Sequence, residues 1–322
     1  MPENLELREA QRQIPIIDVH QHFWRLDRNY YPWLCDPVPV HFRYGDYSSI
    51  KKNYMPAEYR RDIGQNRVVK TVHEEAWWNP ADPVGETRWV TKVAEEHGWP
   101  SALVGNGPLD RDDIEDVLAG HAQSPLTCGI RNFPKSAARA SEAKRGVAGS
   151  MDDPKWRRGY ALLEKHAFSA DIQTPWWHMD ALAALAADFP NTQIIIVHTG
   201  LPNDRSVEGL AGWRRALERA AVHPNVAIKL SGLGEPGLPW TLATNGPIIR
   251  DAIKIFGAER GMFASNFPVD GIVGSFETIY DGFRAAVTDL PLADQHKLFH
   301  DNAERIYRLY RARHDKFRRI HS

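Results

Sequence analysis

Short apolar runs alternate with longer amphipathic stretches along most of the chain. Each run is followed by loop residues and then by a helical pattern, as in residues 179–188 after the fifth run and 206–221 after the sixth. This order is typical of βα units, which build a parallel sheet. The eight runs predicted to be strands are Ile14–Val19, Val68–His73, Ala102–Gly105, Thr127–Ile130, Phe168–Ile172, Gln193–His198, Val226–Leu230 and Met262–Ala264.

Proline marks the ends of two predicted helices. Phe-Pro-Asn at 189–191 and His-Pro-Asn at 223–225 each stand just before the next apolar run, and the residue before a proline disfavours helix. Eight strand–helix units in about 250 residues match the usual size of a (β/α)8 TIM barrel. We therefore expect residues 1–322 to form one α/β barrel domain. A doubly wound open sheet is disfavoured because no glycine-rich phosphate loop opens the first unit.

The connection after the first predicted strand, residues 23–67, is too long for a plain βα loop. It is rich in aromatic side chains, so we expect an ordered insertion over the barrel mouth. Its aromatic residues include Trp24, Tyr30, Tyr31, Trp33, Phe42, Tyr44, Tyr47 and Tyr54.

The composition is ordinary for a soluble globular protein, at 43% hydrophobic and 25% charged residues with a formal net charge of -1. This balance disfavours nucleic-acid partners, and we interpret the basic run over residues 311–319 as a solvated helix end. The polar N-terminus does not resemble a signal peptide, and no apolar run approaches the ~20 residues of a membrane span. Cys35 and Cys128 lie far apart and indicate a reducing compartment. We expect a cytoplasmic protein with no membrane partner; the sequence leaves a homo-oligomer open.

The strongest local signal for chemistry is Asp18-Val19-His20-Gln21-His22, at the end of the first predicted strand. Side chains alternate along an extended segment, so His20 and His22 are expected to point the same way. Sites of (β/α)8 barrels form at this end of the strands. Two imidazoles placed there can share a metal or bind one substrate oxygen, while Asp18 can orient a neighbouring group.

Further polar residues stand at the other predicted strand ends. His198 ends the sixth run, Lys229 lies in the seventh and Asn266 follows the eighth. These groups would otherwise face a low-dielectric cavity, so we expect them to converge on one site. Trp77 and Trp176, each part of a tryptophan pair, are expected to help line its pocket. The other members of this set are Glu74, Glu75, Arg131, Gln173 and Ser231.

Seven motifs stand in this order along the chain: IIDVHQHFW, VHEEAWW, GIRNF, IIIVHTGLP, AIKLSGL, MFASNFPVD and NAERIYRLY. In order and spacing they resemble the Amidohydrolase-2 family, in the group that contains L-fuconolactonases and other sugar-acid and dicarboxylate lactonases. The resemblance runs from about residue 14 to about residue 310 and implies lactone hydrolysis, in some members without a tightly held metal. By position, His20 and His22 match the family's first-strand histidines and His198 its sixth-strand histidine. Arg131 matches an arginine that meets a carboxylate or carbonyl oxygen.

The chain departs from the family at the eighth strand. The family's motif there usually reads GSDWP, with the aspartate as general base or metal ligand, whereas this chain has Asn266 in ASNFP. Asparagine cannot take the proton. Three interpretations stay open: a subgroup in which Asp270 or Glu75 is the base, an introduced substitution that traps substrate, or a loss of hydrolysis.

The residues and the resemblance together predict attack of water on the carbonyl of a lactone or a related acyl compound. His20, His22 and His198 would polarise the carbonyl oxygen, either directly or through one divalent metal such as zinc. The sequence leaves the cofactor open as one zinc ion or none. The residues expected to bind the small-molecule substrate are Arg131, Gln173, Lys229, Trp77 and Trp176, with Arg43 and Arg205 as further partners for a carboxylate.

Two other functions fit the same residues. Related barrels use the same histidines with zinc to decarboxylate aromatic acids, and a barrel whose base is replaced by Asn266 could merely bind a small acid. Carbon dioxide release would indicate the decarboxylase, tight binding without turnover would indicate the binding protein, and proton release would indicate the hydrolase.

Overall fold

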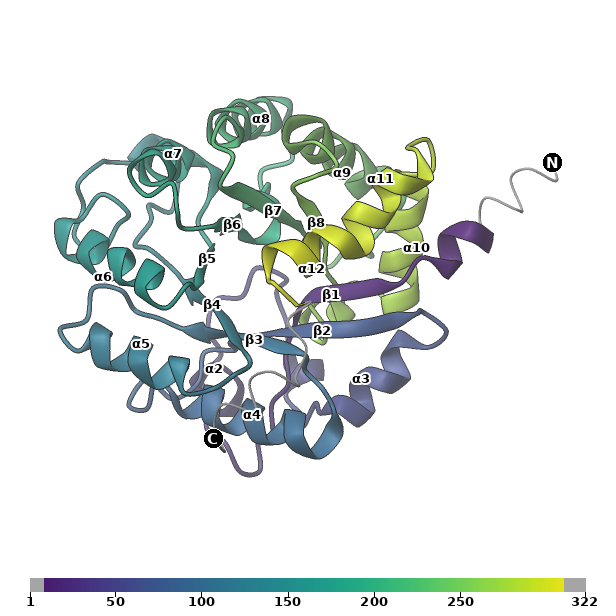
Figure 1. Ribbon diagram of the computed structural model, residues 1–322. Coiled ribbons are helices and arrows are strands. Elements are labelled where there is room, and N and C mark those ends of the chain that lie inside the picture. Colours follow the sequence, from purple (N-terminus) through teal and green to yellow (C-terminus); the bar gives the residue numbers. More distant parts are fainter. Residues whose placement is uncertain (1–8, 310–322) are drawn as a thin grey trace.

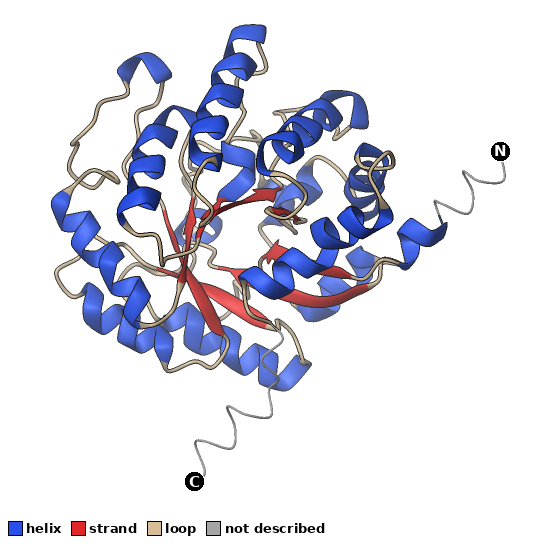
Figure 2. Cartoon of the chain, turned by 45° about the horizontal axis from the view of Figure 1, so that its top comes forward, coloured by secondary structure: helices blue, strands red, loops and turns tan. Residues whose placement is uncertain are grey.

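Eight parallel strands lie side by side in chain order, from β1 to β8. The computed structural model describes residues 9–309. Helices surround the strands (Figure 1), and Figure 2 shows the strands at the centre with the helices outside them. The predicted (β/α)8 TIM barrel is confirmed.

All eight predicted runs form strands, with small shifts at their ends. The main difference is at β6, which was expected to reach His198 but ends at Ile196. His198 and Thr199 adopt left-handed φ angles of 53° and 57°, and a strand cannot continue through that region of the backbone map. The strands are β1 (Ile16–Gln21), β2 (Val68–Glu74), β3 (Ala102–Asn106), β4 (Thr127–Asn132), β5 (Ser169–Ile172), β6 (Ile194–Ile196), β7 (Val226–Leu230) and β8 (Gly261–Phe263).

The barrel closes between β1 and the segment that follows β8. The backbone N–H groups of His22 and Asn266 donate to the carbonyls of Phe267 and His20, at 2.8 and 2.7 Å. The buried carboxylate of Asp18 accepts two further hydrogen bonds from the same segment. This seam therefore fixes the first-strand histidines against Asn266.

One long helix after each strand forms the outer ring. Side-chain caps begin α6, α8, α9 and α10, where Asp153, Ser206, Thr241 and Ser275 accept backbone N–H groups of the first turn. The ring helices are α3 (Pro56–Ile63), α4 (Gly85–His97), α5 (Ile114–Ala122), α6 (Pro154–Lys165), α7 (Met179–Asp188), α8 (Val207–Ala221), α9 (Leu242–Phe256) and α10 (Phe276–Ala286). Shorter helices are α2 (Pro32–Cys35), α11 (Leu292–His296) and α12 (Asn302–Ile306), and single turns lie at Ser48–Ile50, Ala140–Glu142, Trp176–His178, Val197–Gly200, Val269–Ile272 and Lys297–Asp301.

The last described residues cover one end of the barrel, where α12 crosses the strands in Figure 1. Ala303, Ile306 and Tyr307 pack with interior residues such as Ile17 and Met262 in one buried apolar cluster. A second, larger cluster fills the space between the barrel and its helices. Burial of this apolar area is the main stabilising contribution to the fold.

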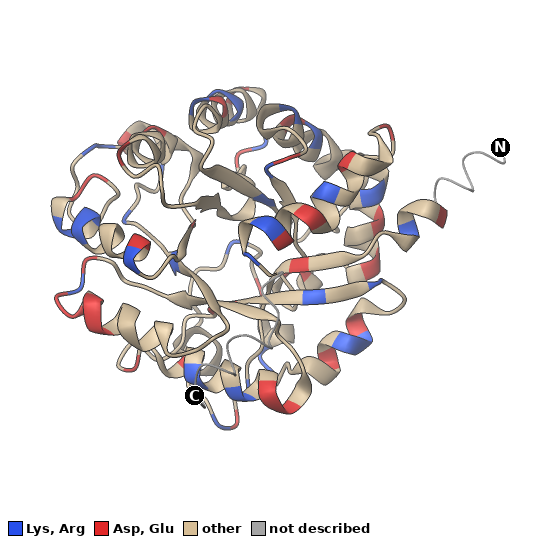
Figure 3. Ribbon diagram, viewed as in Figure 1, with Lys and Arg blue, Asp and Glu red and all other residues tan. Residues whose placement is uncertain are grey.

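Acidic and basic residues are interspersed over the outer helices (Figure 3), which agrees with the near-zero net charge. Among the described residues, no helix combines the length and apolarity needed to cross a bilayer. The basic run at residues 311–319 and residues 1–8 of the polar N-terminus lie outside the described residues.

Candidate active site

A cavity of about 260 Å³ opens where the strands end. Imidazole, guanidinium and aromatic groups form its walls, and within residues 9–309 its lining includes no aspartate or glutamate. Such a lining favours a ligand that accepts hydrogen bonds and presents an apolar face. The lining residues are His22, Trp33, His41, Phe42, Arg43, Ala76, Trp77, Arg131, Phe133, Gln173, His198, Leu201, Asn203, Asn266 and Val269.

The three histidines predicted from the sequence lie together. The ring centroid of His20 is 5.0 Å from that of His22 and 4.5 Å from that of His198. His22 and His198 line the cavity, whereas His20 is fully buried beside them and neither of its ring nitrogens has a hydrogen-bond partner. Burial, and after it the nearby cations, lower the pKa of each imidazole well below its ordinary value. All three are therefore neutral near pH 7.

Asn266 lies between His22 and Asp270. Its Oδ1 is 3.2 Å from His22 Nε2, and its Nδ2 donates to Asp270 Oδ1 at 2.6 Å. The hydroxyl of Tyr44 donates to the same carboxylate oxygen at 2.8 Å. Asp270 is 2% exposed and is absent from the cavity lining, and burial raises its pKa. Asp270 thus contacts Asn266 directly and interacts electrostatically with Arg43, and both of these residues line the cavity.

Glu75, the other base suggested by the sequence, is held by Arg131. Arg131 Nη1 donates to the backbone oxygen of Glu75 at 2.9 Å and to its Oε1 at 3.3 Å, while Nη2 donates to Gln173 Oε1 at 2.5 Å. Burial raises the pKa of Glu75 to about 7, against the lowering effect of Arg131. Arg131 and Gln173 line the cavity, and Arg131 Nε lies 3.6 Å from Glu74 Oε1 in an ion pair without a hydrogen bond. A guanidinium has five N–H groups, so Nη2 keeps one N–H beyond its bond to Gln173 for a ligand.

Lys229 belongs to a fully buried charge cluster next to the histidines. Its Nζ lies 2.6 Å from Glu74 Oε2 and 2.7 Å from Asp171 Oδ2, and Tyr307 donates to the same Asp171 oxygen at 2.6 Å. Burial raises the pKa of Glu74 to about 7; for Lys229 the two carboxylates outweigh burial and raise its pKa. Glu74 Oε2 is also 3.9 Å from His20 Nδ1. Lys229 is therefore occupied by carboxylates and does not line the cavity.

Asp171 and Tyr307 are members of this cluster that the sequence did not assign to the site, whereas Glu74 was among the strand-end residues expected there. The single aspartate in the apolar run Phe168–Ile172 was the available signal for Asp171. Nothing local in the sequence pairs Asp171 with Tyr307, because the two residues are 136 positions apart.

Strained backbone gathers around the cavity. Seven described residues other than glycine have positive φ, and four of them, Trp77, His198, Leu201 and Asn266, line this cavity. Each such residue costs on the order of 1–3 kcal/mol and persists only where its surroundings hold it in place. The strained residues are thus concentrated around this cavity.

The remaining predicted binding residues divide into two groups. Trp77 lines the cavity, 46% exposed and at a right-angled contact with Phe133, and Arg43 lines it with a buried, unpartnered Nη1. Trp176 is not among the lining residues; its ring packs closely against Gly212 of α8. Arg205 is absent from the lining as well and donates to the carbonyl of Leu233.

The donor set does not fit a metal ion. Across residues 9–309, no group of three or more His, Cys, Asp or Glu side chains is arranged to hold one. His22 Nδ1 is taken by the carbonyl of Glu74 at 2.8 Å and its Nε2 faces Asn266. The zinc alternative for His20, His22 and His198 is thus not supported by this arrangement, because an amide stands where the family's aspartate would be.

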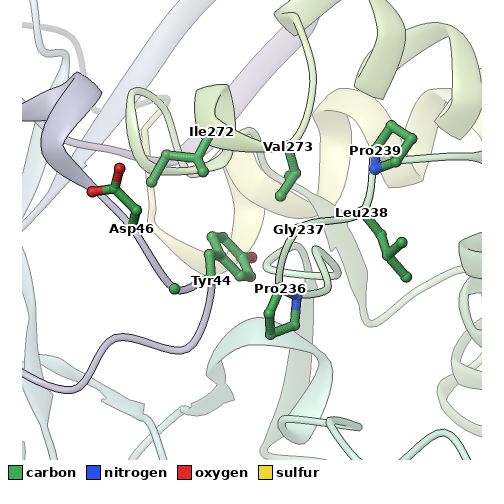
Figure 4. A pocket seen from close by; sticks show the side chains of 9 residues that line it. Tyr44, Asp46, Pro236, Gly237, Leu238, Pro239, Ile272 and Val273 are labelled. Carbon is green, nitrogen blue, oxygen red and sulfur yellow. The ribbon is translucent and has the colours of Figure 1, made fainter.

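A second cavity, of about 650 Å³, is lined by Tyr44 and eight further residues (Figure 4). It is formed by the insertion at Tyr44 and Asp46, the loop after β7 at Pro236–Pro239, and the turn at Ile272 and Val273. Asp46 is the single ionisable carboxylate in this lining, which carries no histidine, arginine or lysine among the residues described. This cavity lacks the reactive groups of the first.

The sequence matches the profile of the Amidohydrolase family (Amidohydro_2) over residues 17–309. It is 39% identical over 299 residues to the uncharacterized protein y4mH of Sinorhizobium fredii (strain NBRC 101917 / NGR234), covering 92% of this chain and 99% of that protein. It is 29% identical over 261 residues to an L-fucono-1,5-lactonase of Burkholderia ambifaria, covering 81% and 82% of the two chains.

Two solved structures of an amidohydrolase from Burkholderia multivorans, one with bound HEPES and one with bound zinc, each resemble the chain with a TM-score of 0.75. They are 24% and 23% identical to it, and each comparison covers 91% of this chain and 99% of that structure. At this level of identity the likeness demonstrates a shared fold.

Proposed function

The chain belongs to the Amidohydrolase family, and on that premise we propose that it hydrolyses a lactone that carries a carboxylate. The proposal rests on one observation above all: two neutral imidazoles and two guanidinium groups face one cavity at the barrel mouth, with no carboxylate in its described lining. Lactone-hydrolysing relatives such as the L-fucono-1,5-lactonase of Burkholderia ambifaria support the choice of reaction.

In this proposal His198 accepts the proton of the attacking water. Its pKa is lowered by burial, so its lone pair is available near pH 7, and its Nδ1 shares a hydrogen bond with Ser231 Oγ at 3.0 Å that holds the ring. The hydrogen bond and the left-handed turn at His198 fix the direction of the imidazole. General base catalysis of this kind contributes about 10²- to 10⁴-fold to the rate.

The guanidinium groups stabilise negative charge. The remaining N–H of Arg131 Nη2 polarises the lactone carbonyl and stabilises the oxyanion, and Arg43 binds the substrate carboxylate. Trp77 covers the ring of the substrate. Trp176 acts at most from the rim, through its packing on α8.

The other candidate residues act by positioning. Glu75 and Gln173 orient Arg131, Asp270 orients Asn266, and Lys229 with Glu74 sets the charge beside His20. In this arrangement Asp270 and Glu75 are one contact away from the reacting atoms. We therefore assign the role of general base to His198 instead of to these two residues, which the sequence had suggested.

The direct test is a pH-indicator assay of the purified protein with two sets of lactones, one bearing a carboxylate and one neutral, including L-fucono-1,5-lactone. The expected result is release of one proton per ring opened, faster for the carboxylate-bearing set. Because lactones open spontaneously, the His198→Ala variant provides the matched background. Carbon dioxide release, or tight binding with no proton release, would replace the proposal by the decarboxylase or the binding-protein alternative.

A further inference from the structure

The atoms around His22 decide whether its imidazole can ligate a metal. Nδ1 lies 2.8 Å from the backbone oxygen of Glu74. A carbonyl oxygen only accepts hydrogen bonds, so Nδ1 carries the proton and donates. In a neutral imidazole the remaining lone pair is then on Nε2, and Nε2 is the one nitrogen through which His22 could bind a metal.

That nitrogen is already occupied by a side chain. The amide of Asn266 lies 3.2 Å from Nε2. On its other side the amide contacts Asp270, and the carboxylate of Asp270 also accepts the hydroxyl of Tyr44 and the backbone N–H of Gly232. Asn266 is 1% exposed and has a positive φ of 54°, so its amide has little freedom to swing away.

The charge of His22 decides how the amide is turned. With the amide oxygen toward Nε2, the contact is a hydrogen bond only in a doubly protonated, charged imidazole, which this buried position disfavours. With the amide turned over, its nitrogen donates to the lone pair of Nε2, and Asp270 holds a proton toward the amide oxygen. A metal would have to break this buried hydrogen bond of His22, and the remaining imidazoles are too few for a catalytic three-histidine zinc centre.

We propose that Asn266, held by Asp270, occupies the ligand position of His22 and keeps the three-histidine cluster free of divalent metal. The inference concerns the site of the proposed hydrolase, but it depends on the donors and acceptors around His22 and stands whether or not the substrate is a lactone. Asn266 is on this account a positioning residue, and Asp270 is the anchor that gives its amide two buried partners.

Metal content tests the proposal without any activity measurement. The wild-type protein, Asn266→Asp and the control Asn203→Asp are incubated with excess zinc, separated from free ion, and analysed by elemental mass spectrometry. Asn266→Asp places a second carboxylate against Asp270 and beside His22, and a cation relieves their repulsion, so we expect roughly one tightly held zinc per chain. Asn203→Asp adds the same charge to the same cavity at a residue outside the Asn266 contact, and like the wild type it should retain at least tenfold less.

Two results would overturn the proposal. One is a wild-type protein that retains about one zinc per chain and loses it on His22→Ala; the other is an Asn266→Asp variant that folds, by circular dichroism, and holds no more zinc than the wild type. If that variant does not fold, the wild type labelled with nitrogen-15 at histidine decides the matter. Its His22 Nε2 resonance should be unchanged by zinc, and a zinc-dependent shift of that resonance would exclude the hydrogen-bonded arrangement.

Discussion

His20 and the charge cluster around Lys229 are neighbours, both fully buried, and differ in whether their charged or ring nitrogens are paired. Lys229 has two carboxylates within 2.7 Å, and one of them also accepts a hydrogen bond from Tyr307. In contrast, both ring nitrogens of His20 lack a partner. Paired buried charges stabilise one arrangement of the barrel, whereas unpaired buried donors and acceptors cost free energy and are retained where a ligand uses them.

The largest expected effect is on catalysis at the mouth. His198→Ala should lower kcat about 10²- to 10⁴-fold, because it removes the proposed base, with little change in the free energy of unfolding. The matched control is His121→Ala, a buried histidine bonded to Thr87 and to the carbonyl of Asn106 and absent from the cavity lining. The His121→Ala variant should have a lower free energy of unfolding and the same kcat as the wild type. Steady-state kinetics and urea unfolding measure both, and a retained kcat in His198→Ala would remove this residue from the mechanism.

Substitution in the charge cluster should act in the opposite way, mainly by lowering the free energy of unfolding. Lys229→Ala leaves Glu74 and Asp171 buried without their cation, which should lower the free energy of unfolding by about 3–5 kcal/mol. Lys165→Ala removes an exposed pair with Glu115 and should change stability far less. Urea unfolding at pH 7 compares the two. Equal, small losses of unfolding free energy in the two variants would show that the buried charge cluster does not stabilise the fold.

We expect Arg43 at the cavity to distinguish negatively charged substrates from neutral ones. Arg43→Met should raise KM about 10- to 100-fold for carboxylate-bearing lactones and leave KM for neutral lactones unchanged, because it removes a charge-assisted hydrogen bond to one substrate class. Arg205→Met, outside the cavity lining, serves as the control. An equal rise in KM for both substrate classes would assign Arg43 a role in shaping the cavity rather than in recognising charge.

The smallest effect concerns the pH dependence of stability. The pKa of His20 is lowered in the folded protein, so below its ordinary value of 6.5 the unfolded chain binds a proton that the folded one does not. The stability that the neutral His20 contributes is therefore fully present above pH 6.5 and is lost as the pH falls. His20→Asn should remove about 1 kcal/mol of this stability change between pH 6.5 and 5.5. Unfolding free energies with the same slope in both proteins would contradict the neutral, buried state of His20.

The sequence predicted the barrel well because its signals are local. Eight apolar runs marked the strands, and the alternation around His20 and His22 placed two imidazoles at one strand end. The strand-end rule for barrels then brought His198 and Arg131 to the same cavity. For these elements, neighbouring residues along the chain carry the information.

The partners of the polar groups could not be predicted in the same way. His22 meets Asn266 across 244 positions and Lys229 meets Glu74 across 155, and no local pattern encodes such contacts. The turn at His198 departs from strand geometry because its backbone is held by tertiary contacts against its own preference. Trp176 looked like a pocket residue by composition but packs on Gly212, since an aromatic ring fits a helix face as readily as a pocket.

The central claim is that water attacks a lactone carbonyl in the cavity of His22 and His198. Turnover of a carboxylate-bearing lactone in isotopically labelled water, with mass analysis of the product, tests it most directly. The account predicts one labelled oxygen in the newly formed carboxylate with wild-type protein, and only the slow spontaneous incorporation with His198→Ala. Rapid, equal incorporation by both proteins, or a product that has lost carbon dioxide, would contradict it.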